Sequence, residues 1–240
     1  MKYGFSVPCA CALGLVALLA SIAPVQAIEP REMRYARPII KRFAPDINRF
    51  WARTYPREYN MGRYRAPKHV RLYNSRRRIY YQTPCGRTLP NEAFYCPANE
   101  GIYLNAKLLN HLVKVRSGGV QKGDYVAVAW LAHEWGHHIQ KVLKWPWRVH
   151  WRTRKFAQFE LQADCFAGAY TADAFERGLI NRHDYREGLR DAWLGGDELY
   201  WNEPGAHGSR RLRRLWFRAG FLHDDVKVCN KVFAEDAPGA

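Results

Sequence analysis

The chain has 240 residues, and its 38 lysines and arginines against 22 aspartates and glutamates give a formal net charge of +16 at pH 7. This length is enough for one domain with a real hydrophobic core. The sequence has neither an internal repeat nor a low-complexity linker, which excludes a repeat protein. No stretch beyond the N-terminus is apolar enough to cross a membrane.

The first 27 residues have the features of a secretory signal peptide. Lys2 supplies a positive charge, residues 11–23 are nearly all apolar or small, and Val25-Gln26-Ala27 offers small residues at the −3 and −1 positions of a cleavage site. The apolar run is short for a membrane-spanning helix, which needs about 20 residues. The sequence predicts export to the periplasm or the medium, with an uncleaved N-terminal anchor as the alternative.

The rest of the chain is predicted to form a helix-rich α+β domain. Residues 28–45 contain three prolines and are predicted as an irregular leader, the domain spans 46–230, and 231–240 form a loose tail. The predicted elements are a short helix near 46–54, strands near 69–74 and at 101–105, and helices at about 106–114, 124–144, 153–178, 182–193 and 208–219.

The sequence HEWGH at 133–137 carries the strongest chemical signal. Residues i and i+4 share one face of a helix, so His133 and His137 can bind one metal ion together. Glu134 lies on the same turn, where it can reach a water molecule at that ion. The motif therefore predicts a zinc hydrolase. The alternative is an amphipathic helix whose histidines are only packed or solvated.

A catalytic zinc site needs a third protein ligand and an open position for water. A histidine-rich extension of the motif would place Gly at 140 and His at 143, but the chain has Gln140 and Leu143, which excludes it. The other solution is a glutamate on a downstream helix. Glu160 and Asp164 are i,i+4 neighbours within 156–178, where Glu160 could bind zinc and Asp164 could hold the far nitrogen of a ligand histidine. A pair of solvated acids is the alternative.

Several motifs together resemble one bacterial family. HEWGHHIQ, ELQADCFAG and HGSRRLRRLWFRAGF occur in this order and are similar to the putative neutral zinc metallopeptidases, and the resemblance runs from about residue 46 to 230. It implies a zincin-like core with a small β-sheet, His133, His137 and Glu160 as zinc ligands, and Glu134 as general base. The 23 positions from His137 to Glu160 are fewer than is common in the family.

His207, in the sequence AHGSRR, is a further candidate. In related metallopeptidases a distal histidine stabilises the oxyanion of the tetrahedral intermediate, and the motif match implies this role for His207. His138 is not expected to be a ligand, because it points about 100° away from His137 on the same helix.

Cys85, Cys96, Cys165 and Cys229 remain after removal of the signal peptide. An even number of cysteines in an exported chain favours disulfides, and four cysteines allow three pairings. Cys85–Cys96 would close a short, turn-rich loop, and Cys165–Cys229 would then tie the C-terminal part to the helix of Glu160. This pairing is the one we predict.

Basic residues cluster at 76–78, 148–155 and 210–218, with tryptophans between them. Such a surface attracts anionic partners. It could be a solvated face, or it could bind an anionic envelope polymer or a membrane surface. Nucleic acid is disfavoured, because export removes it as a partner and the chain has no nucleic-acid motif.

Taken together, these features predict an exported endopeptidase with Zn²⁺ as cofactor and a protein or peptide as substrate. The alternative is a non-catalytic binding protein with a structural zinc site, which would act through its basic aromatic face. An intact Glu134 argues against that alternative, since a structural site needs no base. The oligomeric state is left open.

Overall fold

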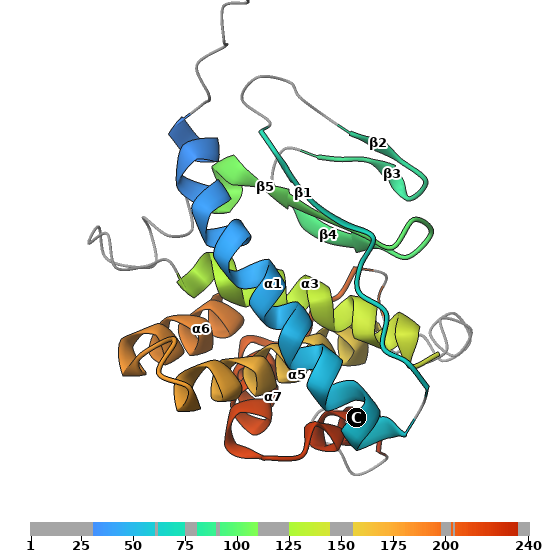
Figure 1. Cartoon of the computed structure of the whole chain (residues 1–240), viewed down its shortest axis with the longest axis vertical. Helices are drawn as coiled ribbons and strands as arrows, with labels where there is room; N and C mark the ends of the chain where they lie inside the picture. Colours follow the sequence, from blue (N-terminus) through green and yellow to red (C-terminus); the bar gives the residue numbers. More distant parts are fainter. Residues whose placement is uncertain are drawn as a thin grey trace, which may run out of the picture.

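The computed structural model describes residues 31–60, 62–74, 81–89, 92–109, 125–144, 156–197, 203 and 205–234. They form the predicted helix-rich α+β fold, with a small sheet above a group of helices (Figure 1). The helices are α1 (Arg31–Tyr59), α3 (Tyr125–Val142), α5 (Phe156–Glu176), α6 (Arg182–Leu194), α7 (Arg210–Leu222) and the 3₁₀-helix η2 (Val226–Phe233). The strands are β1 (His69–Tyr73), β2 (Gln82–Thr83), β3 (Gly86–Arg87), β4 (Ala93–Cys96) and β5 (Gly101–Asn105).

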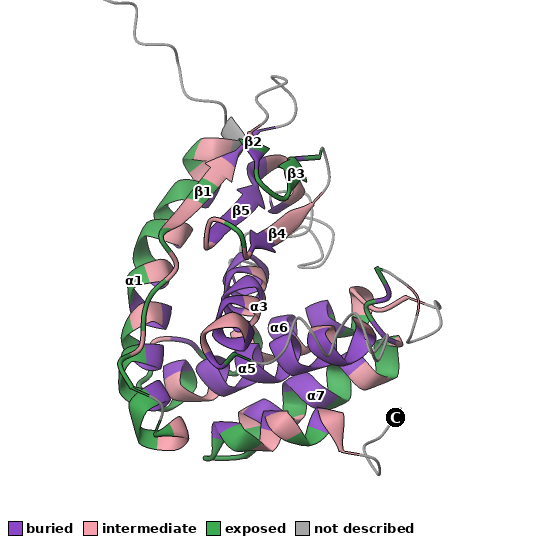
Figure 2. Ribbon diagram, turned by 90° about the vertical axis from the view of Figure 1, so that its right-hand side faces the viewer, coloured by how far each residue is buried: buried purple, intermediate pink, exposed green. Residues whose placement is uncertain are grey.

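The main sheet has the order β1-β5-β4. Strand β1 pairs with β5 in parallel, His69 opposite Gly101, and β4 pairs with β5 in antiparallel orientation, Cys96 opposite Gly101. Every residue of β5 is buried, as expected for a central strand. The sheet packs on α3, and β4 is its edge strand on the side of the cleft described below (Figure 2).

Helices α3 and α5 form the centre of the molecule, and most residues of each helix are buried (Figure 2). Their close approach depends on Gly136: a Cβ at this position would lie 2.9 Å from the Cα of Ala163. A side chain there would therefore push the two helices apart. The contact matters for the site, because Gly136 precedes His137 and Ala163 precedes Asp164.

The predicted irregular leader at 28–45 is wrong from Arg31 onward, because α1 runs through it and through the predicted short helix at 46–54. Three prolines lie inside α1, and each removes one backbone hydrogen bond. Burial of one apolar stripe outweighs this loss, since such packing supplies most of a helix's stability in proteins. The stripe consists of Ala36, Ile39, Phe43, Ile47, Phe50, Trp51 and Tyr55.

The C-terminal helices follow the prediction closely. Helix α6 begins at Arg182 behind a capping box made by Asn181 and Asp184. Helix α7 begins at Arg210, two residues later than predicted, because Ser209 is the N-cap and its Oγ accepts a hydrogen bond from Leu212 N–H. The prediction of a loose tail from residue 231 is wrong for its first residues, since η2 continues to Phe233. Residues 235–240 lie outside the described part.

Both predicted disulfides are formed. Cys85–Cys96 joins the β2–β3 turn to the end of β4, with 5.7 Å between the Cα atoms. Cys165–Cys229 joins α5 to η2, with 5.5 Å between the Cα atoms. The second bridge therefore fixes the C-terminal segment to the helix that carries Glu160 and Asp164.

Several predictions concern residues that the structure does not describe. These are the signal peptide at 1–27, most of the helix at 106–114, and the basic clusters at 76–78 and 148–155. Among the described helices, none combines the length and the apolar character that a membrane crossing requires.

Candidate metal centre and its cleft

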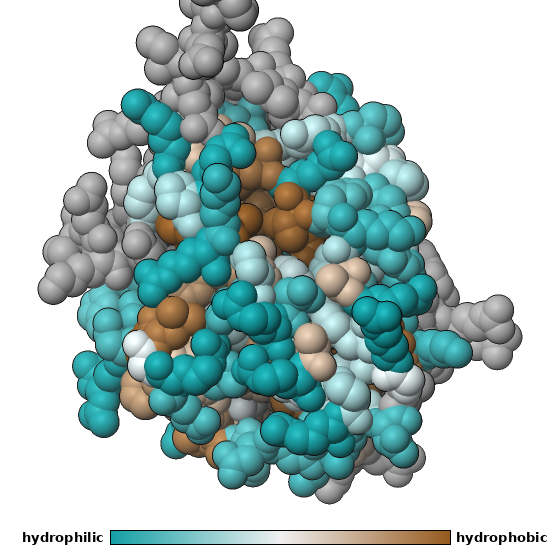
Figure 3. Space-filling model, viewed as in Figure 1, coloured by the Kyte–Doolittle hydropathy of each residue, from teal (hydrophilic) through white to brown (hydrophobic). Residues whose placement is uncertain are grey.

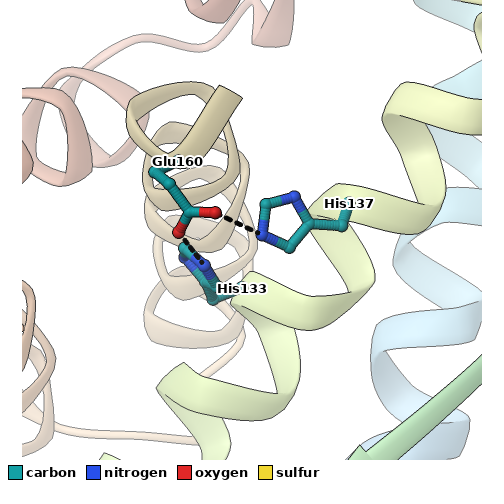
Figure 4. A group of neighbouring side chains, drawn as sticks. All are labelled: His133, His137 and Glu160. Carbon is teal, nitrogen blue, oxygen red and sulfur yellow. Dashed lines mark hydrogen bonds and ion pairs between the residues drawn. The ribbon is translucent and has the colours of Figure 1, made fainter. Parts of the chain in front are cut away.

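Three side chains from two helices converge at the centre of the molecule (Figure 4). His133 and His137 project from α3 toward Glu160 on α5. The Nε2 atom of His133 lies 3.2 Å from Glu160 Oε2, and the Nε2 atom of His137 lies 3.3 Å from Glu160 Oε1. The three donor atoms all lie within 4.8 Å of one another.

The opposite ring nitrogens of both histidines already have partners. His133 Nδ1 lies 2.8 Å from Asp164 Oδ1, and His137 Nδ1 lies 3.0 Å from Gln140 Oε1. Both partners are acceptors, so in the neutral imidazoles Nδ1 carries the proton and Nε2 keeps a lone pair. Two imidazole lone pairs and a carboxylate converging from one side are a donor set that fits Zn²⁺.

Asp164 is in turn held by Arg213 of α7. Arg213 Nε donates to Asp164 Oδ2 at 2.6 Å and Arg213 Nη2 donates to Asp164 Oδ1 at 2.8 Å. A third bond runs from Arg213 Nη1 to the carbonyl oxygen of Gly195 at 2.9 Å. Both charged side chains are buried, so this bidentate geometry is needed to compensate their desolvation.

Neither Arg213 nor the role of Gln140 is predicted from the sequence. Arg213 lies in the arginine-rich segment 210–218, whose charges by themselves indicate only a basic surface. The spacing of Arg213, Trp216, Phe217 and Gly220 places all four on the buried stripe of α7, and this signal was available in the sequence. For Gln140 the only local signal is its i,i+3 spacing from His137, because the hydrogen bond that holds its amide group, from Nε2 to the carbonyl oxygen of Phe159, reaches another helix.

The charges of this cluster are strongly coupled. Burial disfavours the imidazolium of His133, but hydrogen bonds and charge from Asp164 and then Glu160 outweigh burial and raise the pKa of His133 to about 10. Burial likewise disfavours the Glu160 carboxylate, yet the two histidines hold its pKa well below the usual value. Because a proton and a metal ion compete for the same Nε2 lone pair, metal binding here is coupled to proton release.

Glu134 lies beside the three converging side chains and is itself buried. Burial raises the pKa of its carboxyl group, while the charges of His137 and His133 lower it. The carboxylate also accepts a hydrogen bond from the backbone N–H of Tyr95 in β4. Glu134 is thus oriented by the edge strand, and a raised pKa is the property that a group needs to take up and release a proton near neutral pH.

These residues open into a cleft of about 780 Å³. One wall is formed by β4 and the residue before it, from Glu92 to Tyr95. The other walls come mainly from α3, α5, α6 and α7 and are largely apolar; their aromatic side chains are Trp130, Phe156, Phe159 and Phe217. A cleft with an apolar lining and a few converging polar groups is the usual form of a binding site.

His207 lines the same cleft. Its Nδ1 atom lies 3.0 Å from Asp197 Oδ2, and its backbone N–H donates to the same oxygen at 2.9 Å. This pairing orients the ring before α7, while the side chain stays about half exposed.

His138, as predicted, does not join the three converging side chains. Its Nδ1 lies 3.0 Å from the hydroxyl of Tyr95, and its Nε2 lies 2.7 Å from the carbonyl oxygen of Arg65. Burial is the main reason that the pKa of His138 falls to about 4. His138 is therefore a neutral side chain that ties α3 to β4.

The model of the family described as "putative neutral zinc metallopeptidase" matches residues 21–232, so the chain belongs to this family. The match includes α1 and extends beyond the predicted 46–230. The resemblance inferred from the motifs is thereby confirmed. Zn²⁺ is the cofactor of this family, and the donor set formed by His133, His137 and Glu160 fits it.

Curated relatives are similar over part of their length. "Uncharacterized protein YpfJ" of Escherichia coli K12 is 32% identical over 154 residues, which cover 57% of this chain and 53% of the relative. "Uncharacterized protein Rv2575" of Mycobacterium tuberculosis H37Rv is 30% identical over 193 residues, which cover 70% of this chain and 63% of the relative. The chain thus spans less than two thirds of the length of these relatives. No solved structure matches the chain.

Proposed function

We propose that this protein is an exported endopeptidase that hydrolyses peptide bonds with Zn²⁺ held by His133, His137 and Glu160. The observation that carries the proposal is the convergence of these donor atoms in an open cleft, directly beside the buried carboxylate of Glu134. A structural zinc site has four protein ligands and no need of a base. Three donors beside a base favour catalysis.

When bound, Zn²⁺ would act as a Lewis acid toward the scissile carbonyl and lower the pKa of a coordinated water molecule. Glu134 takes a proton from the attacking water and later delivers it to the leaving amine. The bond from Tyr95 N–H keeps its carboxylate directed to the cleft. Asp164 and Gln140 keep the two histidines in the tautomer that leaves Nε2 available.

The substrate is proposed to lie along β4. This strand is at the edge of the sheet, and Ala93, Phe94 and Tyr95 line the cleft. An extended peptide can add to such an edge through backbone hydrogen bonds. That placement brings a backbone carbonyl of the peptide beside Glu134. His207, oriented by Asp197, is the proposed donor to the oxyanion that forms on this carbonyl.

The test is cleavage of unfolded protein by the purified chain. We expect hydrolysis of casein that stops on addition of a chelator and returns with zinc. Glu134→Gln should keep the metal and the fold but lose activity by at least about 100-fold, because the amide cannot accept the proton. Glu176→Gln, an exposed change on α5, is the matched control and should be fully active.

Two outcomes would contradict the proposal. If Glu134→Gln cleaves casein at the rate of the unchanged protein, Glu134 is not the base. If the zinc-loaded protein cleaves neither casein nor a broad peptide library, the centre is structural, and the protein is then the zinc-containing binding protein considered as the alternative.

A further inference from the structure

A second groove lies away from the metal centre, between α1 and β1. Figure 3 shows it as a hollow with apolar atoms at its floor and hydrophilic side chains around it. Its volume is about 540 Å³, and it shares no lining residue with the cleft of the metal centre. We call it the β1 groove and define it by Met33, Arg37, Ile40 and Lys41 of α1 and Val70–Leu72 of β1.

The floor of the β1 groove is apolar but not fully covered. Met33, Ile40, Val70 and Leu72 pack on the main hydrophobic core, and each is only partly buried. Apolar side chains from a helix and a strand thus meet at a continuous surface open to solvent. A surface of this kind, surrounded by polar groups, is typical of an interaction site.

The polar rim of the β1 groove is cationic. Arg37 and Lys41 come from α1 and Arg71 from β1, and the guanidinium of Arg71 lies over the ring of Tyr81 at 5.4 Å. No aspartate or glutamate is among the described residues that line the groove. Lys41 and Arg71 make no ion pair within the part of the chain that the structure describes, and their charges beside an apolar floor are complementary to an anionic partner with apolar side chains.

The backbone of β1 provides the third feature. Within the described ranges, β1 pairs with β5 on one side and with no strand on the other. Side chains of neighbouring strand residues point to opposite faces of a sheet, so a groove on one face would contact only every second residue. Val70, Arg71 and Leu72 are consecutive, and all three line the groove. The groove therefore follows the open edge of the strand. Every second residue of such an edge presents an N–H and a C=O that can pair with another strand.

We propose that the β1 groove binds an extended acidic peptide segment as an added strand along β1. Backbone hydrogen bonds to the open edge hold the segment, alternate apolar side chains contact the floor, and acidic side chains meet the cationic rim. The five residues of β1 accommodate a segment of about five residues, or roughly 16 Å.

Two other occupants fit less well. The acyl chain of a fatty acid would suit the apolar floor and its carboxylate the rim, but it would leave the backbone groups of the open edge without partners. A second copy of the chain would bring an identical cationic rim against this one, at a net charge of +16 for each copy. An acidic peptide satisfies the floor, the rim and the edge together.

Binding can be measured by fluorescence polarisation with a labelled hexapeptide of alternating glutamate and valine. The zinc-loaded Glu134→Gln protein is used throughout, so that cleavage cannot affect the result and the outcome is independent of the proposed peptidase activity. Three further probes are the peptide with lysine in place of glutamate, the peptide with every amide N-methylated, and oleate.

We expect the acidic peptide to bind and the lysine and N-methylated peptides not to bind. The double variant Lys41→Glu/Arg71→Glu should weaken binding of the acidic peptide by about tenfold or more, because two attractions become repulsions. Arg182→Glu/Arg186→Glu is the matched control. It makes the same change in net charge at exposed positions of α6 outside the groove and should leave binding unchanged.

The proposal is overturned if the acidic peptide does not bind. Equal binding of the N-methylated peptide would exclude strand addition, and equal loss of binding in the α6 control would mean that only the overall charge matters. Binding of oleate that depends on Lys41 and Arg71, without binding of the peptide, would identify the groove as a site for acyl chains instead.

Discussion

Arg213 and Asp164 form a buried ion pair with two hydrogen bonds, of 2.6 and 2.8 Å, directly behind His133. The pair links α7 to α5, and Asp164 passes the link on to α3 through His133 Nδ1. One arginine thus connects three helices at the point where the proposed metal ligands converge. Its effect on the metal centre is indirect, since it acts through the orientation of Asp164.

Arg213→Lys should lower zinc affinity by about 10- to 100-fold. A lysine keeps the charge but cannot make two parallel hydrogen bonds to the carboxylate, so Asp164 and His133 lose their fixed orientation. Competition with a fluorescent zinc chelator measures the affinity. Arg214→Lys, an exposed neighbour on the same helix, is the control; a similar loss in both variants would argue against the role of Arg213.

Glu160→Ala should hold much less zinc than the unchanged protein, which should carry about one zinc ion per chain. The reason is the loss of the only carboxylate among the three converging donors. Elemental analysis after dialysis gives the metal content, and Glu176→Ala, on the exposed face of α5, should keep its zinc. Undiminished and equally tight zinc in Glu160→Ala would remove Glu160 from the ligand set.

Replacing both Cys165 and Cys229 by alanine should lower the free energy of unfolding by about 4 kcal/mol, as expected for a bridge that closes a long loop. Zinc affinity should fall as well, because Cys165 follows Asp164 on α5 and the bridge holds that helix. Denaturant unfolding and chelator competition measure the two effects. Removal of Cys85–Cys96 should lower the free energy of unfolding but leave zinc affinity nearly unchanged. A larger loss of zinc affinity without Cys85–Cys96 than without Cys165–Cys229 would disprove the prediction.

Asp46 should make stability depend on pH. Burial alone would raise the pKa of Asp46, but hydrogen bonds from Arg177, Tyr170 and Arg49 hold it below the usual value. A carboxylate with a lowered pKa in the folded state stabilises the fold above its unfolded pKa of about 3.9 and loses this contribution as the pH falls through the folded pKa.

Asp46→Asn should therefore be about 1–3 kcal/mol less stable than the unchanged protein at pH 7. The difference should shrink as the pH is lowered below about 4, where the aspartate also becomes neutral. Urea unfolding between pH 3 and 7 tests this. Asp173→Asn is the control and should lower the free energy of unfolding less, because the side chain of Asp173 is more exposed. A loss of stability in Asp46→Asn that stays constant down to pH 3 would contradict the lowered pKa of Asp46.

The N-terminus of the mature protein should be Ile28. The residues before it have the features of a cleaved signal peptide, and export would account for the two disulfides. Mass spectrometry of protein recovered from the periplasm or the medium of an expressing bacterium decides this. Recovery only from the membrane fraction, with residues 1–27 still present, would show that the segment is an anchor.

Local patterns in the sequence were enough to place the two histidines and to indicate the two acids on the second helix. An i,i+4 spacing determines that His133 and His137 share a face of α3, and the same spacing applies to Glu160 and Asp164 on α5. Four cysteines allow three pairings, and the short, turn-rich loop between Cys85 and Cys96 favoured the pairing that the structure has. Each of these predictions depends on short-range geometry or on a recognisable motif.

Only the tertiary structure decided which residues support that site. Arg213 reaches Asp164 across 49 positions of the chain, and the N–H of Tyr95 reaches Glu134 from another element. Helix α1 forms in spite of three prolines because its apolar stripe is buried against the rest of the molecule. The position of β4 and β1 at the two edges of the described three-stranded sheet likewise follows only from the order of the strands. In each case the deciding energy comes from burial and from hydrogen bonds between distant segments, which a local pattern does not contain.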